Sequence, residues 1–196
     1  QVSNLPQVEA ASAAYRNPRV RYADSLGRQA FLLAIDPETF AGVSTYPPAL
    51  TSLTIPGLMD ALAVSSMAEN EAIPAIFSAA AHPQNKEVGD QIRYFVGSRA
   101  VPFEVRGIIV NFPAMEGEFI ITNLAALENR VDIPNLLAPF NGYREVWLDV
   151  EPAGDTTVTS QVQMISGARV EATAANRLQV LQAFLPAAET LGTFNL

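Results

Sequence analysis

The residue types that most often perform catalysis are scarce in this chain, which has one histidine and no cysteine. His82 is the only side chain that could act as the base of a Ser-His-Asp arrangement, and no Gly-x-Ser-x-Gly motif accompanies it. It stands before Pro83 in a polar stretch, where a histidine is most often simply solvated. We therefore assign no catalytic residue and expect a domain that is not an enzyme.

Metal coordination has equally little support in the sequence. The remaining ligands are scattered carboxylates, at Asp90, Glu116, Glu118 and Asp132. Glu116-Gly117-Glu118 could attract a divalent ion, but a solvated connection between strands is the better interpretation. No glycine-rich phosphate loop precedes a helix, so we expect no metal and no cofactor.

Two further groups of residues have a structural and a functional interpretation. A carboxylate-dependent hydrolase needs two acids that face each other across a cleft, whereas Asp149 and Glu151 flank an apolar strand and suit a solvent-facing edge. The aromatic residues at expected strand positions favour core packing over a ligand groove, namely Phe103, Phe112, Phe119, Tyr143 and Trp147.

The elements that would position these residues begin with three short strands. Alternating or apolar runs predict strands near Val8 to Tyr15, Val20 to Ala23 and Gln29 to Ile35. Asn17-Pro18 and Ser25-Leu26-Gly27 are expected to form the turns between them.

Two helix starts follow. Asp36 before Pro37 predicts an N-cap, because the carboxylate can accept a hydrogen bond from a first-turn amide and Pro37 lacks a donor where none is needed. Thr54-Ile55-Pro56-Gly57 predicts a second start, and apolar residues continue at helical spacing through Ala63.

The segment from Lys86 to Leu127 predicts a turn, a hairpin, a long apolar strand, a Phe-Pro break, another strand and a short helix. Gly97-Ser98 is expected at the hairpin tip, and Asn123 is expected to cap the helix.

The last third of the chain predicts fewer elements. Residues 131–143 are loop-like, and Arg144 to Val150 indicates a strand. Asp155 is expected to start a helix that ends at Gly167, although Val158, Val162 and Met164 also fit a strand. A short strand at Arg169 to Glu171 and a last helix from Thr173 complete the pattern.

Composition excludes several classes of protein. With 49% apolar and 16% charged residues, the 196-residue chain is too hydrophobic to be disordered. The net charge of -8 and scattered single Lys and Arg residues argue against nucleic-acid binding and against attachment to an anionic membrane surface. No run reaches the roughly 20 apolar residues of a membrane span. Because the sequence starts at Gln1 without a leader, we expect an excised soluble fragment or processed product.

Four pieces of sequence stand out in order along the chain: Leu5-Pro6-Gln7-Val8-Glu9; Ala34 to Phe40; Val88 to Ile92 with Phe103 to Ile108 and Ile120 to Leu127; and Val146 to Pro152 with Gly154-Asp155. Together they resemble the extracytoplasmic domain of MacB/FtsX-like ABC transporter permeases. In the first piece Gln7 replaces the glycine that is usual in that family.

The resemblance implies an α+β fold with two lobes. Residues 1–73 and 145–196 would form a mixed α/β membrane-proximal lobe, and residues 74–144 an inserted strand-rich lobe. The domain would sit on the extracytoplasmic side of the cell membrane, between the first transmembrane helix and the remaining three, with both termini on the membrane side.

The implied function is mechanical. The domain would transmit ATP-driven motion that exports or extrudes a substrate, or that acts on an extracytoplasmic partner. Its partners would be an ABC ATPase subunit, reached through the transmembrane part, a second permease copy or homologue, and an extracytoplasmic protein or lipoprotein. Two alternatives stay open: a secreted ligand- or peptide-binding module, and a hydrolase that uses carboxylates or His82.

Overall fold

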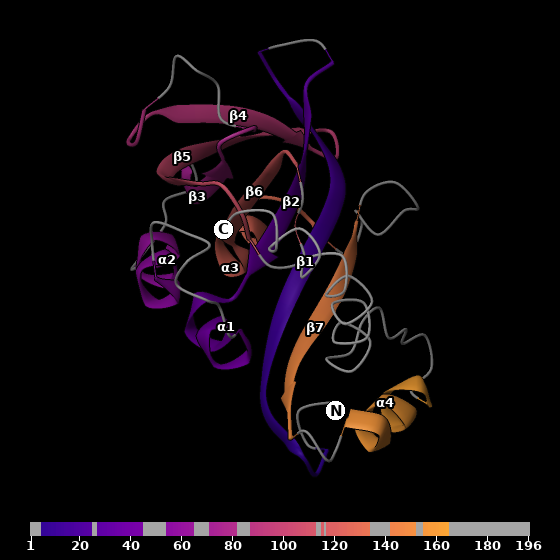
Figure 1. Cartoon of the computed structure of the whole chain (residues 1–196). Coiled ribbons are helices and arrows are strands. Elements are labelled where there is room, and N and C mark those ends of the chain that lie inside the picture. The colour runs from indigo at the N-terminus through magenta and orange to yellow at the C-terminus, as the bar shows by residue number, and fades with distance from the viewer. Residues whose placement is uncertain are drawn as a thin grey trace, which may run out of the picture. The chain divides into compact units, whose positions relative to one another are not determined.

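The computed structural model describes residues 5–24, 27–44, 54–64, 71–81, 87–112, 115, 117–133, 142–151 and 155–164. Seven strands and four helices lie in these ranges (Figure 1), and all seven strands belong to one mixed sheet. The strands are β1 (Val8–Tyr22), β2 (Gln29–Ile35), β3 (Ile73–Ser78), β4 (Gln91–Val96), β5 (Arg99–Ile109), β6 (Phe119–Asn123) and β7 (Tyr143–Val150). The helices are α1 (Pro37–Val43), α2 (Ile55–Leu62), α3 (Leu124–Glu128) and α4 (Asp155–Gln163).

The sheet closes on itself. Its order is β2-β6-β3-β5-β4-β1-β7, and β1 also pairs with β2. The end of β1 therefore contacts two neighbours: Ala14 to Arg21 pair with β2, and Arg21 and Tyr22 pair with β4. Six strands thus form a ring, from which β7 extends as an additional strand beside β1. Closure satisfies backbone groups that an open sheet would leave at its edges.

The interior of the ring holds the larger core cluster. Successive side chains of a strand point to opposite faces, so alternate residues of each strand enter this interior. Helix α3 and the turn after it add further apolar residues to the cluster. Its largest fully buried members are Tyr15, Leu32, Ile73, Phe77, Tyr94 and Phe103.

A second core cluster lies outside the ring. It joins the outward side chains of β2, β3 and β6 to helices α1 and α2, which lie next to each other in Figure 1. Leu33, Ile76 and Ile121 represent the strands, while Phe40 and Leu58 represent the helices, and all five are fully buried. The helices therefore cover one side of the ring with apolar contacts.

The predicted turn at Asn17-Pro18 is wrong, because β1 is one continuous strand of 15 residues. Its register against β2 shifts between Asn17 and Val20, which places Pro18 in a bulge. The Asn17 side chain accepts a hydrogen bond from the backbone amide of Arg19 at 2.9 Å. This local bond and the pairing with β2 keep the strand intact across a proline that cannot donate.

The predicted helix caps and the hairpin are confirmed. Asp36 accepts a hydrogen bond from the Glu38 amide at 3.0 Å, and Thr54 accepts one from the Gly57 amide at 3.3 Å. Asn123 accepts one from the Ala126 amide at 2.9 Å, which starts α3. Strands β4 and β5 pair up to the turn at Gly97-Ser98, where Gly97 has a φ of 63°.

The chain divides into two compact units, residues 1–10 with 148–196 and residues 11–147. The predicted lobe boundaries, at 73/74 and 144/145, stay a prediction; strands from both sides of the first boundary share the ring. The α+β fold class is confirmed. The sequence allows a helix or a strand after Asp155, and the structure has helix α4 there. The predicted helix end at Gly167 and the predicted elements after it lie outside the described residues. Among the residues that the structure describes, no helix combines the length and apolar character that a membrane span requires.

Candidate functional site

Those candidate carboxylates that the structure describes form no metal-binding group. Asp90 accepts a hydrogen bond from the Glu87 amide at 3.0 Å and so holds the turn before β4. Glu118 lies 3.8 Å from the Arg28 guanidinium. His82 and Glu116 lie outside the described residues. Within the described ranges, no group of three or more His, Asp or Glu side chains could hold a metal ion.

The aromatic candidates belong mainly to the two cores. Phe103 lies inside the ring, Phe112 and Phe119 lie in the helix-covered cluster, and Trp147 packs against that cluster while partly buried. Tyr143 is 42% exposed. The core interpretation is therefore confirmed for four of the five. Asp149 is exposed on β7 and Glu151 is exposed just after it, as the sequence indicated.

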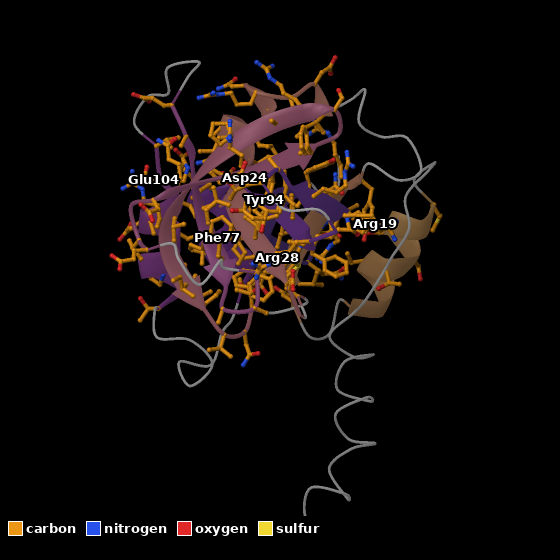
Figure 2. The ribbon with its side chains drawn as sticks, turned by 90° about the horizontal axis from the view of Figure 1, so that it is seen from above. Arg19, Asp24, Arg28, Phe77, Tyr94 and Glu104 are labelled. Carbon is orange, nitrogen blue, oxygen red and sulfur yellow. The ribbon has the colours of Figure 1, made fainter. Side chains whose placement is uncertain are left out.

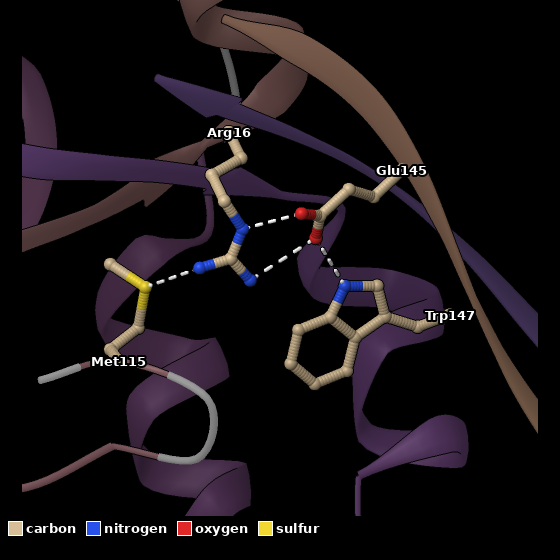
Figure 3. A network of polar contacts seen from close by, with 4 residues as sticks. All are labelled: Arg16, Met115, Glu145 and Trp147. Carbon is tan, nitrogen blue, oxygen red and sulfur yellow. Dashed lines mark hydrogen bonds and ion pairs between the residues drawn. The ribbon is translucent and has the colours of Figure 1, made fainter. Parts of the chain in front are cut away.

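The most closely connected polar group in the described part of the chain centres on Arg16 and Glu145 (Figure 3). The Arg16 guanidinium binds both carboxylate oxygens of Glu145, with 3.2 Å between Nη2 and Oε2. The Trp147 indole donates to Oε2 of the same carboxylate at 2.9 Å. Arg16 Nη1 also lies 3.0 Å from the sulfur of Met115. Both charged side chains are only 14% exposed.

The backbone at Gly142 allows this approach of β7 to β1. Gly142 has a φ of +106°, and a Cβ there would lie 2.4 Å from the carbonyl oxygen of Arg16 and 2.7 Å from the Tyr15 hydroxyl. Only glycine fits such a position without displacing backbone. The sequence-distant partners Arg16 and Glu145 are thus brought together by a close packing of strands that no local pattern reveals.

The network connects strands β1 and β7. Arg16 and the Trp147 indole together occupy three of the roughly four acceptor positions of the Glu145 carboxylate. The bidentate arginine pair is a strong, directional contact between β1 and β7. We interpret it as a structural link, in which Met115 also accepts a hydrogen bond from the guanidinium.

Two buried tyrosines carry the pKa shifts in the described region. Burial raises the pKa of Tyr94 to about 12; the Arg28 charge lowers it, whereas Glu118 and Tyr22 raise it further. Figure 2 shows Tyr94, Phe77 and Arg28 close to one another in the view down onto the ring. The Tyr94 hydroxyl donates to the carbonyl of Ala81 at 3.3 Å.

Tyr15 follows the same rule. Burial raises the pKa of its hydroxyl, and the hydrogen bond from the Asn17 side chain, at 3.3 Å, lowers it in part. Both hydroxyls therefore stay protonated at neutral pH and serve as buried hydrogen-bonding groups. Neither has the depressed pKa that a tyrosine base would need.

Three solved structures are similar to this chain over most of its length. The extracellular domain of YknZ, a noncanonic ABC-type transporter from Gram-positive bacteria, is 12% identical, with a TM-score of 0.46 and coverage of 86% of this chain and 81% of that one. The periplasmic region of MacB from Actinobacillus actinomycetemcomitans is 10% identical, with a TM-score of 0.46 and coverage of 85% and 72%. A domain assigned to a permease protein of Porphyromonas gingivalis is 12% identical, with a TM-score of 0.41 and coverage of 81% and 63%.

No protein-family model and no curated protein sequence matches the chain. The three similar structures are extracellular or periplasmic domains or a permease domain, which is the class that the sequence pieces resemble.

Proposed function

We propose that this chain is the extracytoplasmic domain of an ABC transporter permease subunit and that it transmits ATP-driven motion to export a substrate or to act on an extracytoplasmic partner. The observation that carries the proposal is the turn at Leu5-Pro6-Gln7-Val8. The Val8 amide donates to the Leu5 carbonyl at 3.2 Å, and Gln7 has a φ of 82°. A turn with proline second and a positive φ third is of type II, which prefers glycine third. The family's glycine is therefore explained by the backbone that this chain retains with glutamine.

The other family-like pieces also fall on structural positions that demand their residue types. Asp36 and Asn123 are N-caps, and Gly89 in the turn before β4 has a φ of +99°. Such positions tolerate few substitutions. The backbone geometry at these positions thus supports the resemblance that the sequence suggests.

The architecture suits a part that moves as a body. A six-stranded ring with one core inside and a second core under α1 and α2 resists internal shear, because close-packed interiors transmit displacement. Gln7 and Glu151 also lie side by side, since the Glu151 amide donates to the Gln7 carbonyl at 3.1 Å. The segment just before β1 and the segment just after β7 are therefore adjacent.

The proposal includes the partners and the location. The domain would lie on the extracytoplasmic side of the cell membrane and hydrolyse nothing itself. An ABC ATPase subunit would drive it through transmembrane helices, with a second permease copy or homologue beside it. An extracytoplasmic protein or lipoprotein is a further proposed partner.

The complete reading frame is the first test. It should encode an apolar segment before Gln1 and about three after Leu196, as a four-helix permease requires, with an ATPase encoded nearby. A frame that encodes only a secreted protein would reject the proposal and favour a binding module.

Motion can be tested in the full-length permease. This chain contains no cysteine, so a cysteine at Val110, which is 71% exposed, can carry a unique spin label within the domain. We expect the label-to-label distance between two permease copies to differ between nucleotide-free and ATP-bound states. An unchanged distance in a preparation that still couples ATP hydrolysis to transport would overturn the mechanical role.

A further inference from the structure

The side of the ring opposite the helix-covered strands carries arginines instead of apolar residues. Along this outer face, β1 presents Arg19 and Arg21, and β4 presents Arg93 and the half-buried Phe95. The arginines are exposed, and neither α1 nor α2 contributes to this side in the described residues. We call this surface, made of Arg19, Arg21, Arg93 and Phe95, the arginine face.

Strand register brings these side chains together. Arg21 is paired with Phe95 across β1 and β4, and the Ala23 amide donates to the Arg93 carbonyl at 2.9 Å. Arg19 and Arg93 lie two residues from Arg21 and Phe95 respectively, so they project from the same face. The Arg21 guanidinium carbon lies 5.5 Å from the centre of the Phe95 ring. The sequence, in which these residues appear as scattered single charges, does not reveal this grouping.

The charges of the arginine face are largely uncompensated. Among the described residues, Arg19 and Arg21 form no ion pair with a carboxylate. Arg93 pairs with Asp24 at 3.2 Å, but the two side chains are 62% and 50% exposed, so water and salt weaken that contact. In a protein with a net charge of -8, such a group of cations is conspicuous.

We propose that the arginine face binds an acidic, extended segment of a partner protein. Side chains two apart on a strand are separated by about 7 Å, and an extended peptide spaces carboxylates at alternate positions by the same distance. Carboxylates so spaced can meet Arg19 and Arg21 in turn, and guanidinium–carboxylate pairs are bidentate and directional. The Phe95 ring lies under the Arg21 guanidinium and restricts the conformations of that side chain, which favours a directional contact with a carboxylate.

The border of the face favours a narrow ligand over an anionic membrane. Asp24 lies beside Arg93, and Glu104, paired with Arg106 at 2.9 Å, lies on the neighbouring strand β5. Figure 2 shows Asp24 between Arg19 and Glu104 across the view. A continuous anionic surface would meet these carboxylates, whereas a single acidic strand can follow the arginines alone. This inference rests on the surface and is independent of the proposed transport role.

The test uses the whole chain and a fluorescein-labelled peptide with glutamate at alternate positions, measured by fluorescence anisotropy. The matched control peptide has glutamine at the same positions. We expect the glutamate peptide to bind at least about tenfold more tightly, which corresponds to about one well-formed charged contact. Raising the ionic strength to about 1 M should abolish the difference. Equal binding of both peptides would overturn the proposal.

Variants locate the site. The double variant Arg19→Gln with Arg21→Gln should lose at least about tenfold in affinity for the glutamate peptide. Arg144→Gln is a control for the loss of an exposed arginine, because Arg144 is 49% exposed and pairs with Glu128 of α3 and not with a residue of this face. If Arg144→Gln weakens binding as much as the double variant, the face is not the site.

A charge exchange and a membrane test complete the design. Arg19→Glu with Arg21→Glu should bind a lysine version of the peptide and reject the glutamate version, which a loss of folding cannot imitate. Vesicles with phosphatidylserine should bind the wild-type chain no better than neutral vesicles. If the wild-type chain binds these vesicles but not the glutamate peptide, and the double variant no longer binds the vesicles, the face binds a membrane and the proposed protein partner is rejected.

Discussion

The two outer sides of the ring have opposite chemistry. On β2, β3 and β6 the outward residues are apolar and fully buried, for example Leu33, Ile76 and Ile121, and helices α1 and α2 cover them. On β1 and β4 the outward residues are Arg19, Arg21 and Arg93, which stay exposed. The inward residues of both sides are equally apolar. The side chains on the outer face therefore decide whether a strand is part of the core or part of a surface.

The helix-covered side therefore contributes mainly to folding stability, whereas the arginine face is available to bind a partner. Apolar burial on the helix-covered side adds to the folding free energy that the ring interior supplies, at roughly 25 cal/mol for each Å² removed from water. Exposed charges on the arginine face contribute little to folding and remain available for a partner. Paired substitutions on the two sides test this division.

The largest expected effect is on the helix-covered side. Phe40 is fully buried, with its ring centre 5.0 Å from that of Trp147 and 5.9 Å from that of Phe112. Phe40→Ala should lower the free energy of unfolding by about 3–5 kcal/mol, as large-to-small changes in cores do. Phe95→Ala, the same change on the arginine face, should lower it by about 1 kcal/mol because Phe95 is only half-buried.

Urea denaturation of both variants measures the difference directly. Because both changes remove the same atoms, unfolded-state effects cancel approximately. Equal losses in the two variants would show that the sides do not differ in their contribution to folding.

The ion pairs should repeat the contrast. Glu145→Gln leaves the mostly buried Arg16 charge without its partner and should cost about 2–3 kcal/mol of folding stability, while the shape of the side chain is kept. Asp24→Asn breaks the exposed pair with Arg93 and should cost less than about 1 kcal/mol. Thermal unfolding at low and high salt checks both, since only the exposed pair should be screened strongly. A larger loss for Asp24→Asn than for Glu145→Gln would contradict this comparison.

Burial of Tyr94 in the inner core should make folding stability depend on pH in the alkaline range. Burial raises the pKa of Tyr94 to about 12 from the ordinary value of 10.0, so the folded state keeps a proton that the unfolded state releases. Stability should then be unaffected below pH 10 and should fall as the pH rises from about 10 to about 12, by roughly 2–3 kcal/mol in total. Denaturation series at several pH values test this window. Tyr94→Phe should flatten the decline, and an undiminished decline in that variant would assign it to other groups.

The N-caps of α1 and α2 should make a modest contribution to folding stability. Asp36→Ala removes the acceptor for the Glu38 amide, and Thr54→Ala removes that for the Gly57 amide. Each should destabilise by about 1 kcal/mol. Neither change should alter acidic-peptide binding, because both helices pack away from the arginine face. A loss of peptide affinity in either variant would indicate that the two sides are coupled.

Sequence patterns were most reliable where the chemistry is local. The caps at Asp36, Thr54 and Asn123 and the turn at Gly97 depend on residues within a few positions of each other, and all four are confirmed. At Pro18 the sequence predicts a turn and the structure has a bulge, because pairing with β2 overrides the local signal.

Features made by distant residues could not be predicted from the sequence. Arg16 and Glu145 are 129 positions apart, and no pattern links them before β7 is placed beside β1. The arginine face likewise needs the short pairing of β1 with β4, which joins residues 21 and 22 to 94 and 95. The pairings of β1 with β4 and with β7 are therefore the information that the sequence patterns lack.

The smallest expected effect lies outside both sides of the ring, at Gln7. Its φ of 82° places a non-glycine residue in the left-handed region, where a Cβ costs about 1–2 kcal/mol. Gln7→Gly removes this strain but adds backbone freedom to the unfolded chain, so the net gain should be about 0.5–1 kcal/mol. Gln7→Ala, which keeps a Cβ, is the matched control and should give no gain. Because Gln7 belongs to the unit of residues 1–10 with 148–196, the difference between Phe40→Ala and Phe95→Ala should be the same in the Gln7→Gly background. A changed difference would mean that this turn influences the ring, and a loss of stability in Gln7→Gly would remove the backbone argument for the family's glycine.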